Sequence, residues 1–245
     1  MRIISLNTWG GRGKNITEFV KQNSEAEIFC FQELTSSAAP QPLESGAMPD
    51  LFQKFSAILN QHQRYFFNSR AGYDFGQRKV NFPLENGHGI FVKGLNVLSS
   101  GSEKLPPWDS LPHISGFISY VSLPNFAVIS IHGIWTGKGK DDSPERLSQS
   151  EALLKIADSL PGEKIIIGDF NLNPNTQSLA LLSARYRNLI SEYGIATTRS
   201  DLYDKKQIMP LADYCFVSGG VKVKDFQVPN TEASDHLPLI LDFEI

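Results

Sequence analysis

Carboxylate, amide and imidazole side chains stand at the ends of three apolar segments of this chain. Two segments end in Gln32-Glu33 and in Gly168-Asp169-Phe170-Asn171, and a third begins with Ser234-Asp235-His236. The ends of strands are where α/β proteins place their chemistry. Acidic residues without basic neighbours in the sequence indicate metal binding or proton transfer rather than ion pairs. These segments are therefore the candidates for a functional site.

The segment around Asp169 offers two different polar groups on one side of the chain. Because side chains alternate in an extended segment, we expect Asp169 and Asn171 to point to one side while Phe170 packs away. The carboxylate can take a proton from water, and the amide can donate to a phosphate oxygen. A capping Asp-Asn turn after a strand is the alternative interpretation.

The segment around His236 places two titratable groups at the start of an expected strand. Asp213, at another strand start, offers a carboxylate that can orient and charge the histidine. An imidazolium held by a carboxylate can stabilise the charge on a transferring phosphoryl group. A turn with a surface histidine is the alternative.

Glu33 is the candidate ligand for a hard divalent cation. Mg²⁺ prefers oxygen ligands and keeps several waters, so one or two carboxylates suffice. Asn7, at the end of the first expected strand, supplies an amide that can contact either the metal or a substrate phosphate. His132 ends another expected strand and can donate to a phosphate oxygen, although a single histidine there is more often structural.

Basic and aromatic residues in loops are candidates for substrate binding. Trp108 and Trp135 are candidates for stacking on a substrate, with anchoring in the core as the alternative. The loop 135–140 (WTGKGK) could contribute to a basic rim around an acidic cleft, with ordinary solvated surface as the alternative. Further basic residues that could join this rim are Arg12, Arg70, Arg78 and Lys79.

The composition is that of a globular protein. With 245 residues, 41% of them hydrophobic and 20% charged, the chain can bury one core, and we expect a single domain over residues 1–245. A net charge of −3 gives no basic stripe for non-specific nucleic-acid binding, although a metal in an acidic cleft inverts the local field. Cys30 and Cys215 lie in apolar segments and are expected to be buried thiols.

We expect no signal peptide in this sequence. Its first residues form an expected strand, and no apolar run approaches the length of a membrane span, about 18 residues. We therefore expect a cytoplasmic protein without a membrane span. Nothing in the sequence indicates an obligate partner, and we expect a monomer.

Hydrophobic patterning predicts alternating strands and helices interrupted by an antiparallel block. A helix with Ser143 as its cap and Pro144 at its first position is expected to run to about Ser159. Asp50 is expected to cap another helix, and a third is expected from about Thr176 to Ala184. Strands are expected at 2–7, 27–31, 127–133, 164–171, 212–218, 221–228 and 237–244, with short antiparallel strands between Tyr65 and Phe126. Two mixed sheets packed face to face, with helices outside, would bury these strands.

Six short motifs in order carry a family resemblance that covers the chain from Asn7 to His236. LNTW, FQE, SIHG, GDFN, ADY and SDHLPL resemble the motifs of the endonuclease/exonuclease/phosphatase superfamily. Its members include exonuclease III-like enzymes, pancreatic-type deoxyribonucleases, neutral sphingomyelinases and inositol polyphosphate 5-phosphatases. The resemblance implies an α/β fold, specifically a four-layer α/β/β/α sandwich of two mixed β-sheets flanked by helices.

The same resemblance implies hydrolysis of a phosphoester with Mg²⁺, or alternatively Mn²⁺, as the cofactor. It implies that Glu33 binds the metal, helped by Asn7 and Asp235. It also implies that Asp169 orients or deprotonates the attacking water.

The remaining roles that the resemblance implies concern the phosphate. Asn171 is expected to position water and phosphate. His236, paired with either Asp213 or Asp235, is expected to stabilise the charge of the transition state together with His132.

Departures from the apurinic endonuclease pattern bear on the substrate. That branch shows WN-x-NG-x-R, QETK and Tyr-x-Pro-Asn, whereas this chain has LNTWGGR, QELT and SIHGIW. A histidine at position 132 is closer to the deoxyribonuclease, sphingomyelinase and phosphatase branches. Abasic-site repair is therefore disfavoured. We expect a phosphodiesterase with nucleic acid as the leading substrate class. A phosphatase or phospholipase C-type enzyme is the first alternative, and an inactive phosphate-binding module is the second.

Overall fold

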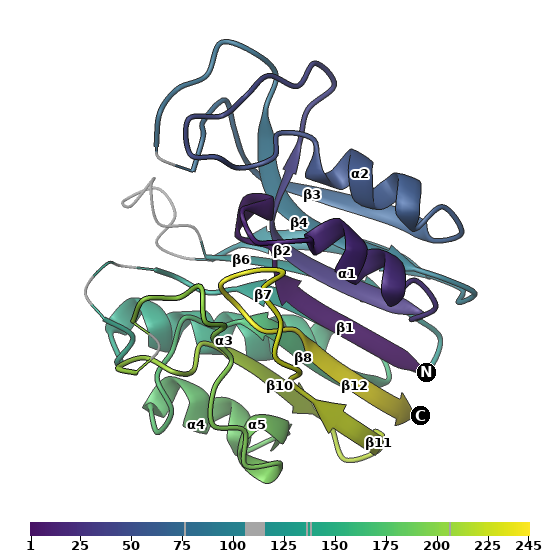
Figure 1. The fold of residues 1–245 in the computed structure, drawn as a ribbon. Coiled ribbons are helices and arrows are strands. Elements are labelled where there is room, and N and C mark those ends of the chain that lie inside the picture. Colours follow the sequence, from purple (N-terminus) through teal and green to yellow (C-terminus); the bar gives the residue numbers. More distant parts are fainter. Residues whose placement is uncertain (76, 106–115, 136, 138, 206) are drawn as a thin grey trace.

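The protein is built on two six-stranded mixed sheets that pack face to face (Figure 1). A computed structural model describes residues 1–75, 77–105, 116–135, 137, 139–205 and 207–245. In spatial order the first sheet consists of β11 (Lys222–Gln227), β12 (Leu239–Glu244), β1 (Arg2–Asn7), β2 (Ile28–Ser36), β4 (Glu85–Val92) and β3 (Gln63–Ala71). The second consists of β5 (Ser99–Lys104), β6 (Phe117–Ser122), β7 (Phe126–His132), β8 (Glu163–Asp169), β10 (Asp213–Val217) and β9 (Arg187–Asn188).

Helices cover the outer faces of both sheets. α1 (Ile16–Gln22) and α2 (Leu51–Ile58) lie on the first sheet, as Figure 1 shows. The second sheet carries α3 (Pro144–Ser159), α4 (Gln177–Ser183) and α5 (Leu189–Glu192), and a short 3₁₀ helix, η1 (Trp9–Gly11), follows β1. This arrangement confirms the expected four-layer sandwich. Among the described helices, none combines the length and the apolar character needed to cross a bilayer.

Alternation along the central strands sends large apolar side chains to both faces of the first sheet. Ile3, Ile28 and Cys30 pack between the two sheets, whereas their neighbours Ile4 and Phe29 pack under α1 and α2. Strands buried on both faces are expected to be continuously apolar, which explains why these segments contain few polar residues. Cys30 is buried and free, and so is Cys215, as expected.

The expected cap of α3 is confirmed, and α4 lies within the expected range of 176–184. Ser143 accepts a hydrogen bond from the backbone of Arg146, one turn into α3. Thr176 caps α4 in the same way. The expectation for α2 was wrong in one detail, because the Asp50 side chain makes no capping hydrogen bond. It pairs instead with Lys54, one turn further along the helix.

The expected antiparallel block is divided between the two sheets. β3 and β4 pair antiparallel in the first sheet, while β5 and β6 pair antiparallel in the second. The chain therefore crosses from one sheet to the other between β4 and β5. β4 and β6 are largely buried, whereas β3 and β5 are exposed or half-buried. Each pair thus joins one buried and one more exposed strand, so the sequence does not mark the crossing.

Candidate active site

Three neighbouring strands of the second sheet bring three candidate residues into one row. Asp169 is the last residue of β8, and it is paired in register with His132 of β7 on one side and with Asp213 of β10 on the other. The approach of β7 to β8 depends on Gly168, whose φ is 140°. A Cβ atom there would lie 2.3 Å from the Ile131 carbonyl oxygen.

Glu33 reaches the site from a β-bulge in the first sheet. β2 continues to Ser36, so the expectation that the strand ends at Phe31 was wrong. The register with β4 shifts between Phe31 and Leu34, and Glu33 has a φ of 53°. Bulges redirect side chains and are common beside active sites. Here the bulge turns the Glu33 carboxylate toward the second sheet.

Asn7 lies between the two sheets and connects their carboxylates. Its Nδ2 donates to Glu33 Oε1 at 3.0 Å and to Asp169 Oδ2 at 3.1 Å. Its Oδ1 accepts from the backbone of Trp9 at 3.0 Å, and its carbonyl accepts from Ser234 Oγ at 2.7 Å. Both ends of this buried amide are therefore fixed.

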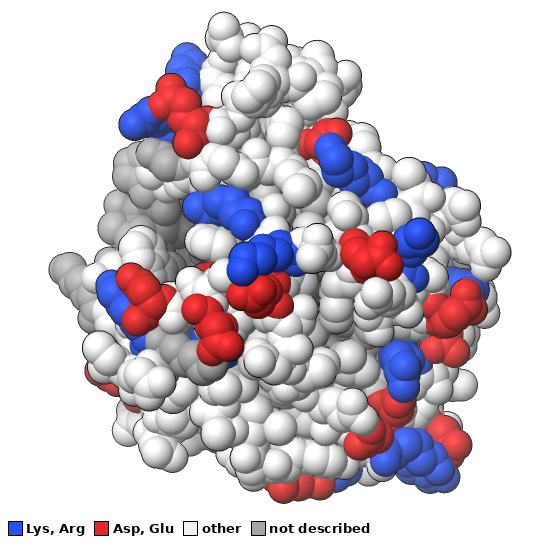
Figure 2. All heavy atoms as spheres, in the orientation of Figure 1, with Lys and Arg blue, Asp and Glu red and all other residues white. Residues whose placement is uncertain are grey.

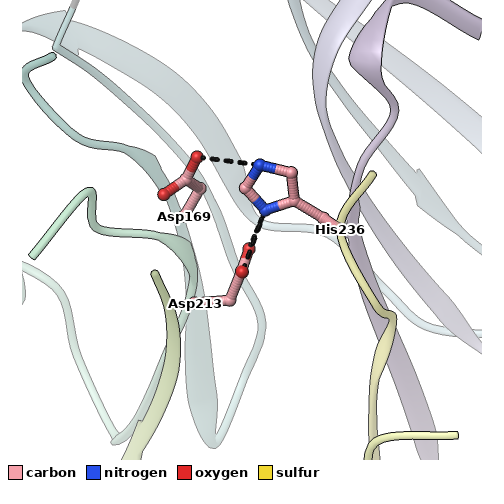
Figure 3. Close-up of side chains that lie close together, drawn as sticks. All are labelled: Asp169, Asp213 and His236. Carbon is pink, nitrogen blue, oxygen red and sulfur yellow. Dashed lines mark hydrogen bonds and ion pairs between the residues drawn. The ribbon is translucent and has the colours of Figure 1, made fainter. Parts of the chain in front are cut away.

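His236 is held between two carboxylates, as Figure 3 shows. Its Nδ1 lies 2.9 Å from both oxygens of Asp213, and its Nε2 lies 3.6 Å from Asp169 Oδ2. Of the two expected partners, Asp213 is thus the one that contacts the ring. Burial and Arg199 lower the pKa of His236, but Asp213, Asp169 and Asp235 outweigh them and raise it.

Asp169 is a buried carboxylate that remains ionised. Burial raises its pKa, but His236, Lys140 and His132 outweigh burial and lower it well below the usual range. Its Oδ1 accepts from the backbone N–H of Asn171 at 2.8 Å. Asn171 has a φ of 53° and donates to the Gly133 carbonyl at 3.2 Å. Asp169 and Asn171 both line the central cavity.

The packing of Phe170 agrees with the expected alternation along this segment. The ring is fully buried and packs against Tyr214 and Phe216. Asp169 and Asn171 thus face the cavity while the residue between them anchors the segment in the core.

These groups open into one cavity of about 680 Å³. Arg12 and Trp135 both line it, and 55% of Trp135 is exposed. The Arg12 guanidinium lies 4.5 Å from the Trp9 ring centroid. Trp108 falls outside the described residues.

The expected basic rim is partly present. Arg70 lines the cavity, but Arg78 pairs with Glu44 and Lys79 is exposed. Lys140 is no surface residue, since only 2% of it is exposed. On the face drawn in Figure 2, Lys and Arg side chains alternate with Asp and Glu and form no continuous basic surface.

Two buried residues beside the site were not singled out from the sequence. Arg199 contacts His236 Nε2 and lies 3.5 Å from Asp235 Oδ2. His88 lies with its ring centroid 6.3 Å from that of His132, and burial lowers its pKa well below the usual value. Neither residue stands at a strand end, which was the signal that identified the other candidates.

Three of the clustered residues could hold a metal ion. One ligand atom each from Asp169, Asp213 and His236 lies within 4.8 Å of the others. A second group of oxygen ligands, Glu33 and Asp235, lines the same cavity. The chain thus contains a candidate metal site.

Comparison with curated proteins finds bacterial relatives. A UPF0294 protein of Vibrio vulnificus strain YJ016 is 31% identical over 153 residues, which make up 60% of this chain and 50% of that protein. A UPF0294 protein of Vibrio parahaemolyticus is 30% identical over 142 residues, 57% of this chain and 48% of that protein. The chain therefore spans about half the length of these curated relatives.

Solved structures share the fold at low sequence identity. An endonuclease/exonuclease/phosphatase from Beutenbergia cavernae has a TM-score of 0.73 at 16% identity, covering 100% of this chain and 71% of that one. The human Nocturnin catalytic domain with bound sulfate anion has a TM-score of 0.68 at 15% identity, covering 100% of this chain and 93% of that one. D. rerio TDP2 complexed with single strand DNA product has a TM-score of 0.66 at 15% identity, covering 100% of this chain and 99% of that one.

A family model extends over nearly all of the elements that build the site. The model described as Endonuclease/Exonuclease/phosphatase family matches residues 4–236. The match begins within β1, which ends in Asn7, and closes on His236, so it includes every strand end described above. The chain belongs to the endonuclease/exonuclease/phosphatase family.

Proposed function

We propose that this protein hydrolyses phosphodiester bonds with the help of a bound divalent cation, and that nucleic acid is its leading substrate class. The observation that carries the proposal is the position of Glu33 opposite the row formed by His132, Asp169 and Asp213. Carboxylates for a cation thus face groups that can move protons and stabilise an oxyanion. This combination suits attack of water on phosphorus.

The charge balance of the site fits a cation. Burial raises the pKa of Asp235. The negative charges of Glu33 and Asp169 also raise it, whereas His236 and Arg199 lower it. A divalent ion bound by Glu33 and Asp235 would favour the charged forms of both carboxylates. We expect Mg²⁺, with Mn²⁺ as the alternative, because the available ligands are oxygens.

Glu33 and Asp235 are the better cation ligands, and Asn7 holds Glu33 in place by donating to its Oε1. In the alternative group, Asp213 occupies Nδ1 of His236 and the Arg199 guanidinium contacts Nε2. A cation bound to that ring would have to displace one of these partners, and the guanidinium would repel it. His236 therefore suits charge stabilisation better than metal binding.

The protein groups then divide the chemistry among them. A bound cation would acidify water and neutralise charge on the phosphate. Asp169 is ionised and can accept a proton from the attacking water, while Asn171 positions that water. The His236 imidazolium, paired with Asp213, supplies positive charge beside the phosphate, and His132 donates to the phosphate oxygens as negative charge develops.

The cavity wall favours nucleic acid over lipid. Trp9, Arg12 and Trp135 line it together with Arg70 and Phe75. Aromatic rings stack on bases and guanidinium groups bind phosphates, whereas a lipid would require an exposed apolar ridge. Proteins of the same fold were solved with single strand DNA product, in D. rerio TDP2, and with sulfate, in human Nocturnin.

Two other functions are weaker. A phosphatase or phospholipase C-type activity uses the same chemistry, but the basic and aromatic wall gives it no particular support. An inactive phosphate-binding module would be expected to lack one of the acidic or histidine groups. Glu33, Asp169, Asp213 and His236 are all present and close together.

Hydrolysis of bis-p-nitrophenyl phosphate tests the proposal. We expect turnover by the wild type in Mg²⁺, none in EDTA, and a loss of about 100- to 10,000-fold in Asp169→Asn. Asp158→Asn, an exposed acid on α3, is the matched control and is expected to keep full activity. Metal-independent turnover, or full turnover by Asp169→Asn, would refute the proposal. A panel of plasmid, single strands, abasic duplex, inositol phosphates and sphingomyelin then assigns the substrate class.

A further inference from the structure

Lys140 is a buried lysine whose ammonium group makes no hydrogen bond in the described chain. Only 2% of the residue is exposed, and among the described residues its Nζ has no hydrogen-bond partner. It nevertheless lines the cavity that contains Asp169 and His236. An ammonium group has three donors, and burying it without acceptors is unfavourable. A ligand with several acceptor oxygens would satisfy it.

The backbone around Lys140 is held at three successive carbonyl groups. Arg146 of α3, itself buried, donates to the carbonyl oxygens of Gly139 and Asp141 at 2.6 and 2.5 Å. The backbone N–H of Asn173 donates to the Lys140 carbonyl at 2.8 Å. The position of the Lys140 backbone is therefore fixed. Such preorganisation is typical of a binding residue and unusual for a solvated lysine.

Arg199 is a second buried cation that lines the same cavity. Only 3% of it is exposed, and its guanidinium lies 4.2 Å from the Tyr203 ring centroid. Its Nη1 faces Asp235 and His236, but within the described chain its Nε has no acceptor. Arg199 and Lys140 therefore both line the cavity, and each has a buried donor without a partner in the described chain.

Burial makes the charge of Lys140 unfavourable, and the nearby carboxylates offset this effect only in part. Burial lowers its pKa to about 8, Asp169 opposes this effect, and Arg199 reinforces it. Asp213 and Asp235 also oppose it but do not restore the ordinary value. The two cations repel each other, and a multiply charged anion placed between them would be attracted by both.

We propose that Lys140 and Arg199 form an anion-binding wall that holds the non-bridging oxygens of a phosphate group, across the cavity from Glu33. The identification of this anion as the phosphate of an ester substrate rests on the proposed function. The wall would hold the phosphate beside both cations, while Arg199 Nη1 keeps its ion pair with Asp235 at 3.5 Å. Lys140 is thus a substrate-binding residue rather than part of a solvated loop.

Calorimetric titration with inorganic phosphate, once with Mg²⁺ and once with EDTA, tests the wall without requiring turnover. We expect the Kd to rise about tenfold or more in Lys140→Met, because a charge-assisted hydrogen bond is lost. Lys155→Met, on the exposed side of the same helix as Arg146, is the matched control and is expected to bind like the wild type. Thermal unfolding verifies that each variant folds, and Lys140→Gln repeats the test if the methionine variant does not.

The outcomes separate the wall from the proposed function. Equal phosphate affinity in the wild type and in the folded Lys140 variant, or no phosphate binding by the wild type, overturns the wall. Hydrolysis of bis-p-nitrophenyl phosphate is followed in parallel. A wild type that binds phosphate through Lys140 but hydrolyses no ester supports the wall and contradicts the proposed hydrolysis.

Discussion

Asn7 Nδ2 donates to Asp169 Oδ2 across 3.1 Å, and this hydrogen bond joins the last residue of β1 to the last residue of β8. The two strands belong to different sheets. The candidate site therefore lies on the seam between the sheets, and its geometry depends on how they pack. The Asn7 amide also donates to Glu33, so one buried side chain sets the spacing of both carboxylates.

Removing the Asp213 carboxylate is expected to lower the pKa of His236. Burial and Arg199 already lower that pKa, and Asp213 is the first of the three carboxylates that raise it. Histidine NMR titrations of metal-free wild type and Asp213→Asn measure the change. His62, whose pKa is lowered mainly by burial, is the internal control and is expected to titrate alike in both proteins.

The same change has a consequence for stability. Because the folded pKa of His236 is raised, its imidazolium stabilises the fold fully below about pH 6.5 and loses this effect as pH rises through the folded pKa. Urea unfolding at several pH values is therefore expected to show the wild-type advantage over Asp213→Asn shrinking toward alkaline pH. An unchanged His236 pKa in the variant would contradict the assigned pairing.

Gly168→Ala is expected to destabilise the fold. A side chain at a φ of 140° is strained, and the added Cβ would meet the Ile131 carbonyl oxygen at 2.3 Å. We expect a loss of about 2 kcal/mol or more in the free energy of unfolding. Gly219→Ala is the matched control, since a Cβ there meets no heavy atom of the described chain within 4 Å. Equal stability of the two variants in urea would count against the close approach of β7 and β8.

Trp135→Ala is expected to weaken binding of single-stranded nucleic acid and to leave the chemistry intact. The side chain is 55% exposed at the edge of the cavity. Stacking of a base on an aromatic ring contributes about 1–3 kcal/mol, so KM for an oligonucleotide is expected to rise about tenfold while kcat is kept. The activity on bis-p-nitrophenyl phosphate, which has no base, serves as the control. An unaltered KM would favour a substrate without bases.

Much of the fold could be predicted because its signals are local. Ser143 and Pro144 mark the start of α3 by their own chemistry. The strands that end in Asn7 and Asp169 are marked by continuous apolar runs, and the polar residues that follow them indicate the site. The partition of the antiparallel strands between two sheets depends on long-range packing, which short local segments do not encode.

The finer parts of the site depend on contacts between distant residues. The bulge that orients Glu33 arises from the register between β2 and β4. No residue type in the segment FQEL predicts this bulge. The burial of Lys140 depends on Arg146 and Asn173 holding its loop. The pairing of His236 with Asp213 rather than with its neighbour Asp235 is set by where β10 begins beside the end of β8.

The most direct test of metal-dependent hydrolysis is the rate of bis-p-nitrophenyl phosphate cleavage as free Mg²⁺ is raised from an EDTA-buffered start. The wild type is expected to be inactive without the ion and to reach a plateau with it. Glu33→Gln, which keeps the size of the side chain but loses its charge, is expected to need about tenfold more Mg²⁺ or more for half-maximal rate. Cleavage that EDTA does not reduce, or a Glu33→Gln curve that overlays the wild type, would contradict a cation held by Glu33.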